Sequence, residues 1–204
     1  MVFDPTYPSI DKTKFQEHEW NRLYGDVQEA IPNNCPKPLG REVYLHMFIE
    51  SGHVTDETTR KSRTGYFIYM NSALVNWISK KQATIETSVF GAEFVAMKQR
   101  MEAVRVLRYK LRIMGVQISG PTYVYGDNMS VIHNTQHPES TLRKKSDLIC
   151  YHAMRESVAM GESLTGNILT VKNCADLATK IISGGQKRDH LVGKLLFDIV
   201  DRFR

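Results

Sequence analysis

The sequence lacks long apolar runs, paired cysteines and a hydrophobic leader, and each absence excludes a class of protein. No apolar run approaches the roughly 20 residues that a membrane-spanning helix needs. Residues 1–5 lack the basic-then-apolar order of a signal peptide. The three cysteines, Cys35, Cys150 and Cys174, are far apart and odd in number, which argues against a disulfide scaffold and a zinc site. We therefore expect neither a secreted nor a membrane protein, and a location in the cytoplasm or nucleus.

Length and charge define the broad class of the chain. It has 204 residues, 42% of them hydrophobic, which indicates one packed domain with an appended arm. Lys and Arg outnumber Asp and Glu by 27 to 22, a net charge of +5. A solvated basic surface would account for this excess. The basic residues nevertheless cluster at 60–63, 80–81, 105–112 and 143–145, as is typical of a protein that binds a polyanion.

Proline marks the boundary of the arm, because five of the seven prolines lie at or before position 38. Such spacing breaks helices and strands. We predict an N-terminal arm or connection segment over 1–42, with one short helix whose Trp20 and Tyr24 dock on the core. The remaining boundaries are a domain at 43–183 and a C-terminal helix at 184–204.

Regular apolar patterns begin at residue 44 and predict an α/β fold. Strands are expected at 44–50, 65–70, 74–78, 122–126 and 168–171, the second and third forming a hairpin across Asn71 and Ser72. A long helix is expected at 89–114, where apolar residues recur every three or four positions. Shorter helices are expected at 128–134, 145–160, 175–182 and 191–203. This order predicts a five-stranded mixed sheet flanked by helices.

Four acidic residues fall at strand ends or helix starts in this scheme: Glu50, Glu93, Asp127 and Asp176. Asp127 and Asp176 could each stabilise a helix N-terminus. Glu50 and Glu93 could simply lie on the surface. Four carboxylates brought together would instead suit a hard divalent cation such as Mg²⁺, which prefers oxygen ligands and completes its sphere with water or substrate phosphate.

Six strings in this order resemble the ribonuclease H domain of a copia-type LTR retrotransposon polyprotein, the reverse transcriptase-associated domain. They are TRKSRTGY at 59–66, WISKKQ at 77–82, ETSVFGAEFVA at 86–96, GDNMS at 126–130, YHAMRE at 151–156 and ADLATK at 175–180. The resemblance implies a ribonuclease H-like fold and endonucleolytic hydrolysis of the RNA strand in RNA–DNA hybrids. It also implies that Glu50, Glu93, Asp127 and Asp176 are catalytic and hold two Mg²⁺ or Mn²⁺ ions.

The first acidic position departs from the family pattern. The family normally has Asp-x-Asp at the end of the first strand, where this chain reads Glu50-Ser51-Gly52. Glutamate is longer than aspartate by about 1.5 Å, and a misplacement of about 1 Å can cost on the order of 10²-fold in rate. Two hypotheses therefore stay open. The chain is either a working or impaired nuclease, or an inactive retrotransposon-derived subunit that binds nucleic acid or serves in a larger assembly.

Partners follow from the same resemblance. An RNA–DNA hybrid is the expected ligand, bound through its phosphates and recognised by its shape. Reverse transcriptase and integrase portions would be neighbours if the chain is a fragment of a polyprotein, and no membrane partner is expected. The alternative for the basic residues is a solvated face. Candidate contacts are Arg60, Lys61, Arg63, Lys80, Lys81 and Asn128.

Overall fold

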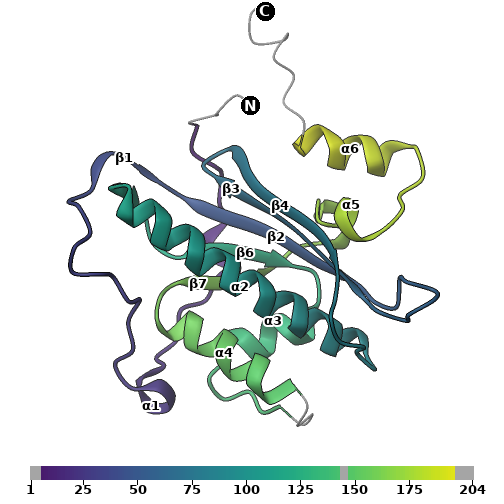
Figure 1. The fold of residues 1–204 in the computed structure, drawn as a ribbon, viewed down its shortest axis with the longest axis horizontal. Helices are drawn as coiled ribbons and strands as arrows, with labels where there is room; N and C mark the ends of the chain where they lie inside the picture. The colour runs from purple at the N-terminus through teal and green to yellow at the C-terminus, as the bar shows by residue number, and fades with distance from the viewer. Residues whose placement is uncertain (1–5, 143–146, 196–204) are drawn as a thin grey trace, which may run out of the picture.

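A five-stranded sheet forms the centre of the protein in a computed structural model, which describes residues 6–142 and 147–195 (Figure 1). Its strands lie in the order β4-β3-β2-β6-β7, and a separate two-stranded parallel sheet joins β1 to β5. The strands are β1 Leu39–Val43, β2 Leu45–Gly52, β3 Arg63–Met70, β4 Ala73–Lys81, β5 Val116–Ile118, β6 Thr122–Gly126 and β7 Ser163–Asn167. The helices are α1 Asn21–Tyr24, α2 Val89–Ile113, α3 Met129–Gln136, α4 Leu148–Ala159, α5 Asp176–Thr179 and α6 Gln186–Leu195.

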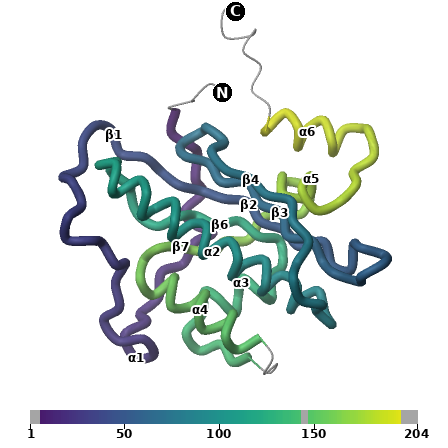
Figure 2. Tube along the Cα trace, viewed as in Figure 1, coloured from purple at the N-terminus to yellow at the C-terminus, as the bar shows by residue number. Residues whose placement is uncertain are grey.

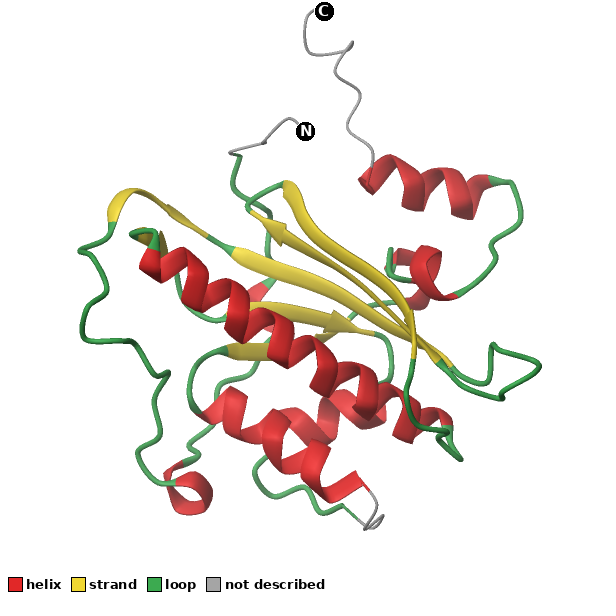
Figure 3. Cartoon of the chain, viewed as in Figure 1, coloured by secondary structure: helices red, strands yellow, loops and turns green. Residues whose placement is uncertain are grey.

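The sheet is mixed, as predicted. β2, β3 and β4 pair antiparallel, and the β3–β4 turn places Asn71 at a positive φ of 53°, a conformation that asparagine tolerates. β6 then pairs parallel to both β2 and β7, which requires the long crossover through α2 (Figure 3). The parallel strands β2 and β6 therefore end at the same edge of the sheet.

One face of the sheet is covered by α2, α3 and α4. The predicted three- and four-residue spacing on α2 buries Phe94, Met97, Met101 and Val104, which pack with Ile49 and other apolar residues of the strands. The Ser88 side chain accepts a hydrogen bond from the Gly91 amide at 3.1 Å and caps α2 where the sequence predicts its start. This packing fixes the first turns of α2 against the sheet.

The opposite face is covered by the N-terminal arm and by α5 and α6. Phe15 packs edge-on against Tyr123 and Tyr125, with ring centroids 5.0 Å away in both cases. A Cβ on Gly166 of β7 would lie 2.7 Å from the Phe15 ring, so a side chain there would displace it. Trp20 is buried beside them, which confirms the predicted docking of that residue. The arm in Figure 2 is thus part of the packed structure.

Several predicted elements need correction. The fifth strand expected at 168–171 is wrong: β7 lies at Ser163–Asn167, and Thr170–Lys172 forms a short 3-10 helix. β1 and β5 have no predicted counterpart. The helix expected at 175–182 is confined to α5, and α6 begins at Gln186, before the expected start at 191. The basic cluster at 143–145, the predicted helix start at 145 and residues 196–203 lie outside the described residues. Each described helix is too short or too polar to cross a membrane.

His46 on β2 is a buried titratable group whose protonation the fold opposes. Its ring stacks on Tyr69 with centroids 4.9 Å apart. Burial lowers the pKa of His46 from 6.5 to about 4. Since the folded pKa lies below the unfolded one, the stabilisation is complete above pH 6.5 and is lost as the pH falls towards 4. We expect the free energy of unfolding to fall by about 2 kcal/mol between pH 7 and pH 5 from this group.

Urea unfolding of the unmodified chain and of His46→Phe at both pH values isolates this contribution. His46→Phe keeps an aromatic ring against Tyr69 but cannot be protonated, so the change from pH 7 to pH 5 should be about 2 kcal/mol more favourable to the variant than to the unmodified chain. The same pH dependence in both chains would contradict the assignment to His46.

Candidate metal centre

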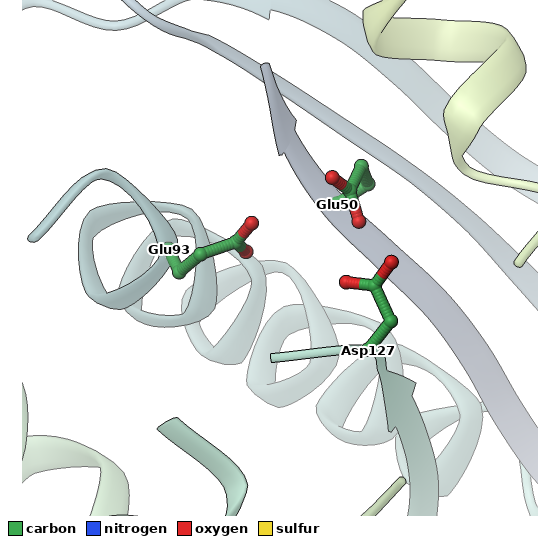
Figure 4. Close-up of side chains that lie close together, drawn as sticks. All are labelled: Glu50, Glu93 and Asp127. Atoms are coloured by element: carbon green, nitrogen blue, oxygen red, sulfur yellow. The ribbon is translucent and has the colours of Figure 1, made fainter. Parts of the chain in front are cut away.

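Three of the four predicted carboxylates converge at one point. Glu50 comes from the end of β2, Glu93 from the first turns of α2, and Asp127 from the residue directly after β6. One carboxylate oxygen from each lies within 4.8 Å of the others, and Figure 4 shows the three side chains pointing towards one another. Glu50 and Glu93 are buried and Asp127 is partly exposed, so solvent reaches the cluster at Asp127.

Strand register explains why Glu50 and Asp127 meet. β2 and β6 run parallel with Phe48 opposite Tyr125, and Glu50 and Asp127 each follow two residues later. Side chains alternate along a strand, so both acids lie on the same face of the sheet as Phe48 and Tyr125, whose rings stack on each other. Glu93 reaches the same point from α2, which covers the other face. The fold therefore brings together acids that are 34 to 77 positions apart in the sequence.

The electrostatics of this cluster fit a hard cation. Burial raises the pKa of Glu50, a hydrogen bond and the charge of Asp127 raise it further, and Lys180 only partly offsets these effects. Burial, then the charges of Glu50 and Asp127, also raise the pKa of Glu93 well above its usual value. Three carboxylates that share a partly buried space repel one another unless a cation or proton intervenes. Their oxygen atoms are the ligands that Mg²⁺ and Mn²⁺ prefer, so this donor set fits the expected group.

Asp176, the fourth predicted ligand, lies outside the three-carboxylate cluster and is paired with two lysines. Its carboxylate is fully buried and accepts from Lys180 Nζ at 2.6 Å and from Lys187 Nζ at 2.7 Å. Lys180 Nζ also donates to Glu50 Oε1 at 3.0 Å, so one ammonium group joins the two carboxylates. Asn173 donates to the other Glu50 oxygen at 3.2 Å. The fourth acid is thus connected to the cluster through Lys180.

The absence of a second acid at Gly52 has a steric explanation. A Cβ at this position would lie 2.6 Å from Thr55 Cγ2 and 2.9 Å from the Thr179 backbone oxygen. A backbone oxygen cannot move aside without displacing α5. At Gly65, the β3 partner of Glu50, a Cβ would likewise lie 2.7 Å from the Ala178 side chain. Two glycines therefore let α5 approach the sheet closely and bring Lys180 to Glu50.

The predicted basic contacts gather at the same end of the sheet. Arg63 pairs with Gly52 in register, two residues beyond Glu50, at the end of the β3–β4 hairpin away from its turn. Lys81 forms an ion pair with Asp56, which offsets part of the positive charge. The basic residues at this end are Arg60, Lys61, Arg63, Lys80 and Lys81.

Asn128 lies beside Asp127 and has a structural role. Its side-chain oxygen accepts from the Val131 amide at 3.2 Å and caps α3. This cap fixes the backbone that follows Asp127. Contact between Asn128 and nucleic acid stays a prediction, as do the contacts of the five basic residues.

Three residues at the site were missed by sequence reasoning. Lys180 stands four positions after Asp176, a spacing that pairs side chains on a helix, and this was the available signal. Asn173 and Gln82 gave none. Gln82 is buried and donates to the Ala92 carbonyl at 2.8 Å and to Thr64 at 3.1 Å, which ties the end of β4 to α2 beside Glu93.

The sheet order and the flanking helices give the protein the ribonuclease H-like fold. Among solved structures, it is similar to LC11-RNase H1 in complex with an RNA/DNA hybrid, with a TM-score of 0.50 and 14% identity. That match covers 66% of this chain and 93% of the other.

No family model matches the chain. Its sequence is 26% identical over 144 residues, 71% of the chain, to the retrovirus-related Pol polyprotein from transposon RE2 of Arabidopsis thaliana. It is 27% identical over 143 residues, 70% of the chain, to that from transposon TNT 1-94 of Nicotiana tabacum. The resemblance to retrotransposon polyproteins that the six strings indicated is therefore confirmed. The aligned part spans about a tenth of the length of these relatives: 10% and 11%.

Proposed function

We propose that this chain is a metal-dependent ribonuclease H that hydrolyses the RNA strand of RNA–DNA hybrids, as a part or derivative of a retrotransposon Pol polyprotein. The observation that carries the proposal is the convergence of Glu50, Glu93 and Asp127 within 4.8 Å at the end of β2 and β6. The similarity to a ribonuclease H solved with a hybrid and to Pol polyproteins supports the choice of substrate.

The residues of the site would divide the work of the reaction. Glu50, Glu93 and Asp127 would hold the cation, Mg²⁺ or Mn²⁺, and Asp176 would support them through Lys180. The bound cation would supply Lewis-acid activation of water and charge stabilisation at the scissile phosphate. Burial of Glu50 and Glu93 limits the access of water to their carboxylates and fixes their positions.

Substrate binding would use the basic end of the β3–β4 hairpin. Arg60, Lys61 and Lys80 would contact phosphates. Such contacts position a duplex without reading its sequence. Affinity for a hybrid should therefore fall steeply with salt and depend little on sequence. The 2′-hydroxyl and the shape of the hybrid would distinguish it from duplex DNA.

The direct test is cleavage of an end-labelled RNA–DNA hybrid with Mg²⁺ or Mn²⁺, with Asp127→Asn as the control. We expect cut RNA fragments from the unmodified chain, none in EDTA, and none above background from the variant. No product above the Asp127→Asn control would contradict a working nuclease.

Glu50→Asp then separates the two hypotheses for the first acid. If the unmodified chain binds the hybrid without cutting it and Glu50→Asp cuts it, the longer side chain accounts for the lost activity. If neither cuts it but both bind it, the chain is a binding subunit with a ribonuclease H-like fold.

A further inference from the structure

Lys180 lies where a cation shared by Glu50 and Asp176 would lie. Its ammonium nitrogen is 3.0 Å from Glu50 Oε1 and 2.6 Å from Asp176 Oδ1. Glu50 also belongs to the three-carboxylate cluster, so it is the acid that both positions share. In two-metal sites the cations lie about 3.5–4 Å apart and have ligands in common. Lys180 thus has the position and the charge sign of a second cation.

The ion pairs of Asp176 leave little of its carboxylate free to bind a metal ion. Lys180 and Lys187 take its two oxygens, both at ion-pair distance, and the carboxylate itself is completely buried. The second oxygen of Glu50 accepts from Asn173. A divalent ion between Glu50 and Asp176 would have to displace Lys180 before it could bind.

Charge balance agrees with a single divalent ion. The four carboxylates together carry four negative charges when ionised, and the ammonium groups of Lys180 and Lys187 balance two of them. One divalent ion at Glu50, Glu93 and Asp127 would balance the remaining two. A second ion would add an excess of positive charge in a site that is largely buried, and burying unbalanced charge is costly.

We propose that the Lys180 ammonium group occupies the second cation position, so that the substrate-free chain binds one divalent ion. This inference rests on the proposed function, because it takes the three carboxylates as metal ligands. Lys180 is a positioning residue here: it holds Glu50 and Asp176 together in place of a metal. Its side chain is 40% exposed, so it can withdraw towards solvent when the phosphates of a substrate bring in a second ion.

The test counts Mn²⁺ ions bound to the full chain in the absence of nucleic acid, from the loss of the free Mn²⁺ signal in electron paramagnetic resonance. We expect one ion per unmodified chain. Lys180→Met removes the ammonium group and keeps a side chain of similar length, and it should bind two ions. Lys180→Gln provides a second neutral variant, and circular dichroism confirms that each variant is folded.

Lys187→Met is the matched control, because it also removes a lysine from Asp176 but does not touch Glu50. It should still bind one ion. Two ions or none on the unmodified chain, or one ion on both folded Lys180 variants, would overturn the inference. A chain that binds one ion but never cuts hybrid would keep the inference while the proposed function fails. If the chain cuts hybrid but binds two ions in the absence of nucleic acid, the inference fails while the proposed function stands.

Discussion

Replacing Glu93 by glutamine is expected to lower hybrid cleavage by more than about 100-fold, because the loss of groups that merely support metal ligands already costs 10- to 100-fold. The same change should raise the melting temperature of the metal-free chain. Burial and the charges of Glu50 and Asp127 raise the pKa of Glu93, which means that its ionised form is unfavourable in the folded state. Glutamine removes that charge with little change of shape.

Cleavage rates and thermal unfolding in EDTA measure the two effects, and each 1 kcal/mol gained should raise the melting temperature by about 2–4 °C. Glu102→Gln is the matched control, since Glu102 lies on the same helix and is paired with Lys98 on its exposed side. It should change neither quantity appreciably. A Glu93→Gln chain that cuts hybrid at the normal rate would remove Glu93 from the site.

Strong local patterns account for the elements that were predicted well. The helix at 89–114 ends within one residue of α2, and the strand at 122–126 coincides with β6. In both, apolar spacing and flanking glycine or serine act within a single segment. The hairpin turn at Asn71 was found for the same reason. α2 carries Glu93, Asp127 directly follows β6, and the strand expected at 44–50 overlaps β2, which carries Glu50, so three of the acids could be placed on their elements from sequence alone.

Elements that depend on tertiary packing could not be predicted. β7 reads Ser-Leu-Thr-Gly-Asn and has no apolar run, while the apolar residues just after it suggested a strand. Position 166 needs a glycine because Phe15 of the distant arm packs where a Cβ would lie. Among the described strands, β1 and β5 pair only with each other, 77 residues apart at Leu39 and Val116, and neither has a distinctive pattern.

The same limit applies to the candidate site. Glu50, Glu93, Asp127 and Asp176 were predicted to meet from their places at strand ends and helix starts and from the family resemblance, and the first three do so. The lysines that pair with Asp176 were not predicted. Lys187 comes from α6, 11 residues further along the chain, and no sequence pattern connects it to an acid. The close approach of α5 that brings Lys180 to Glu50 depends on glycines whose role emerges only from packing.

Glu29→Ala is expected to destabilise the protein by about 3 kcal/mol, because it leaves a buried charge without its partner. Glu29 lies in the N-terminal arm, and its carboxylate accepts from Arg108 Nε and Nη2, both at 2.8 Å, and from Arg112 Nη2 at 2.6 Å. The Arg108 side chain is only 3% exposed. Burial would raise the pKa of Glu29, but the hydrogen bonds and charges of the two arginines outweigh it and lower the pKa to about 2.

Thermal unfolding of the full chain should show a fall in melting temperature of about 6–12 °C for Glu29→Ala. Glu17→Ala, at an exposed position of the same arm, should leave it nearly unchanged. Arg108→Met in the Glu29→Ala background removes the orphaned charge, so the double variant should lose less than the sum of the two single changes. Additive losses would mean that Glu29 and Arg108 do not stabilise each other. Coupling between them would instead establish the arm as a structural part of the domain, joined to the helix that carries Glu93.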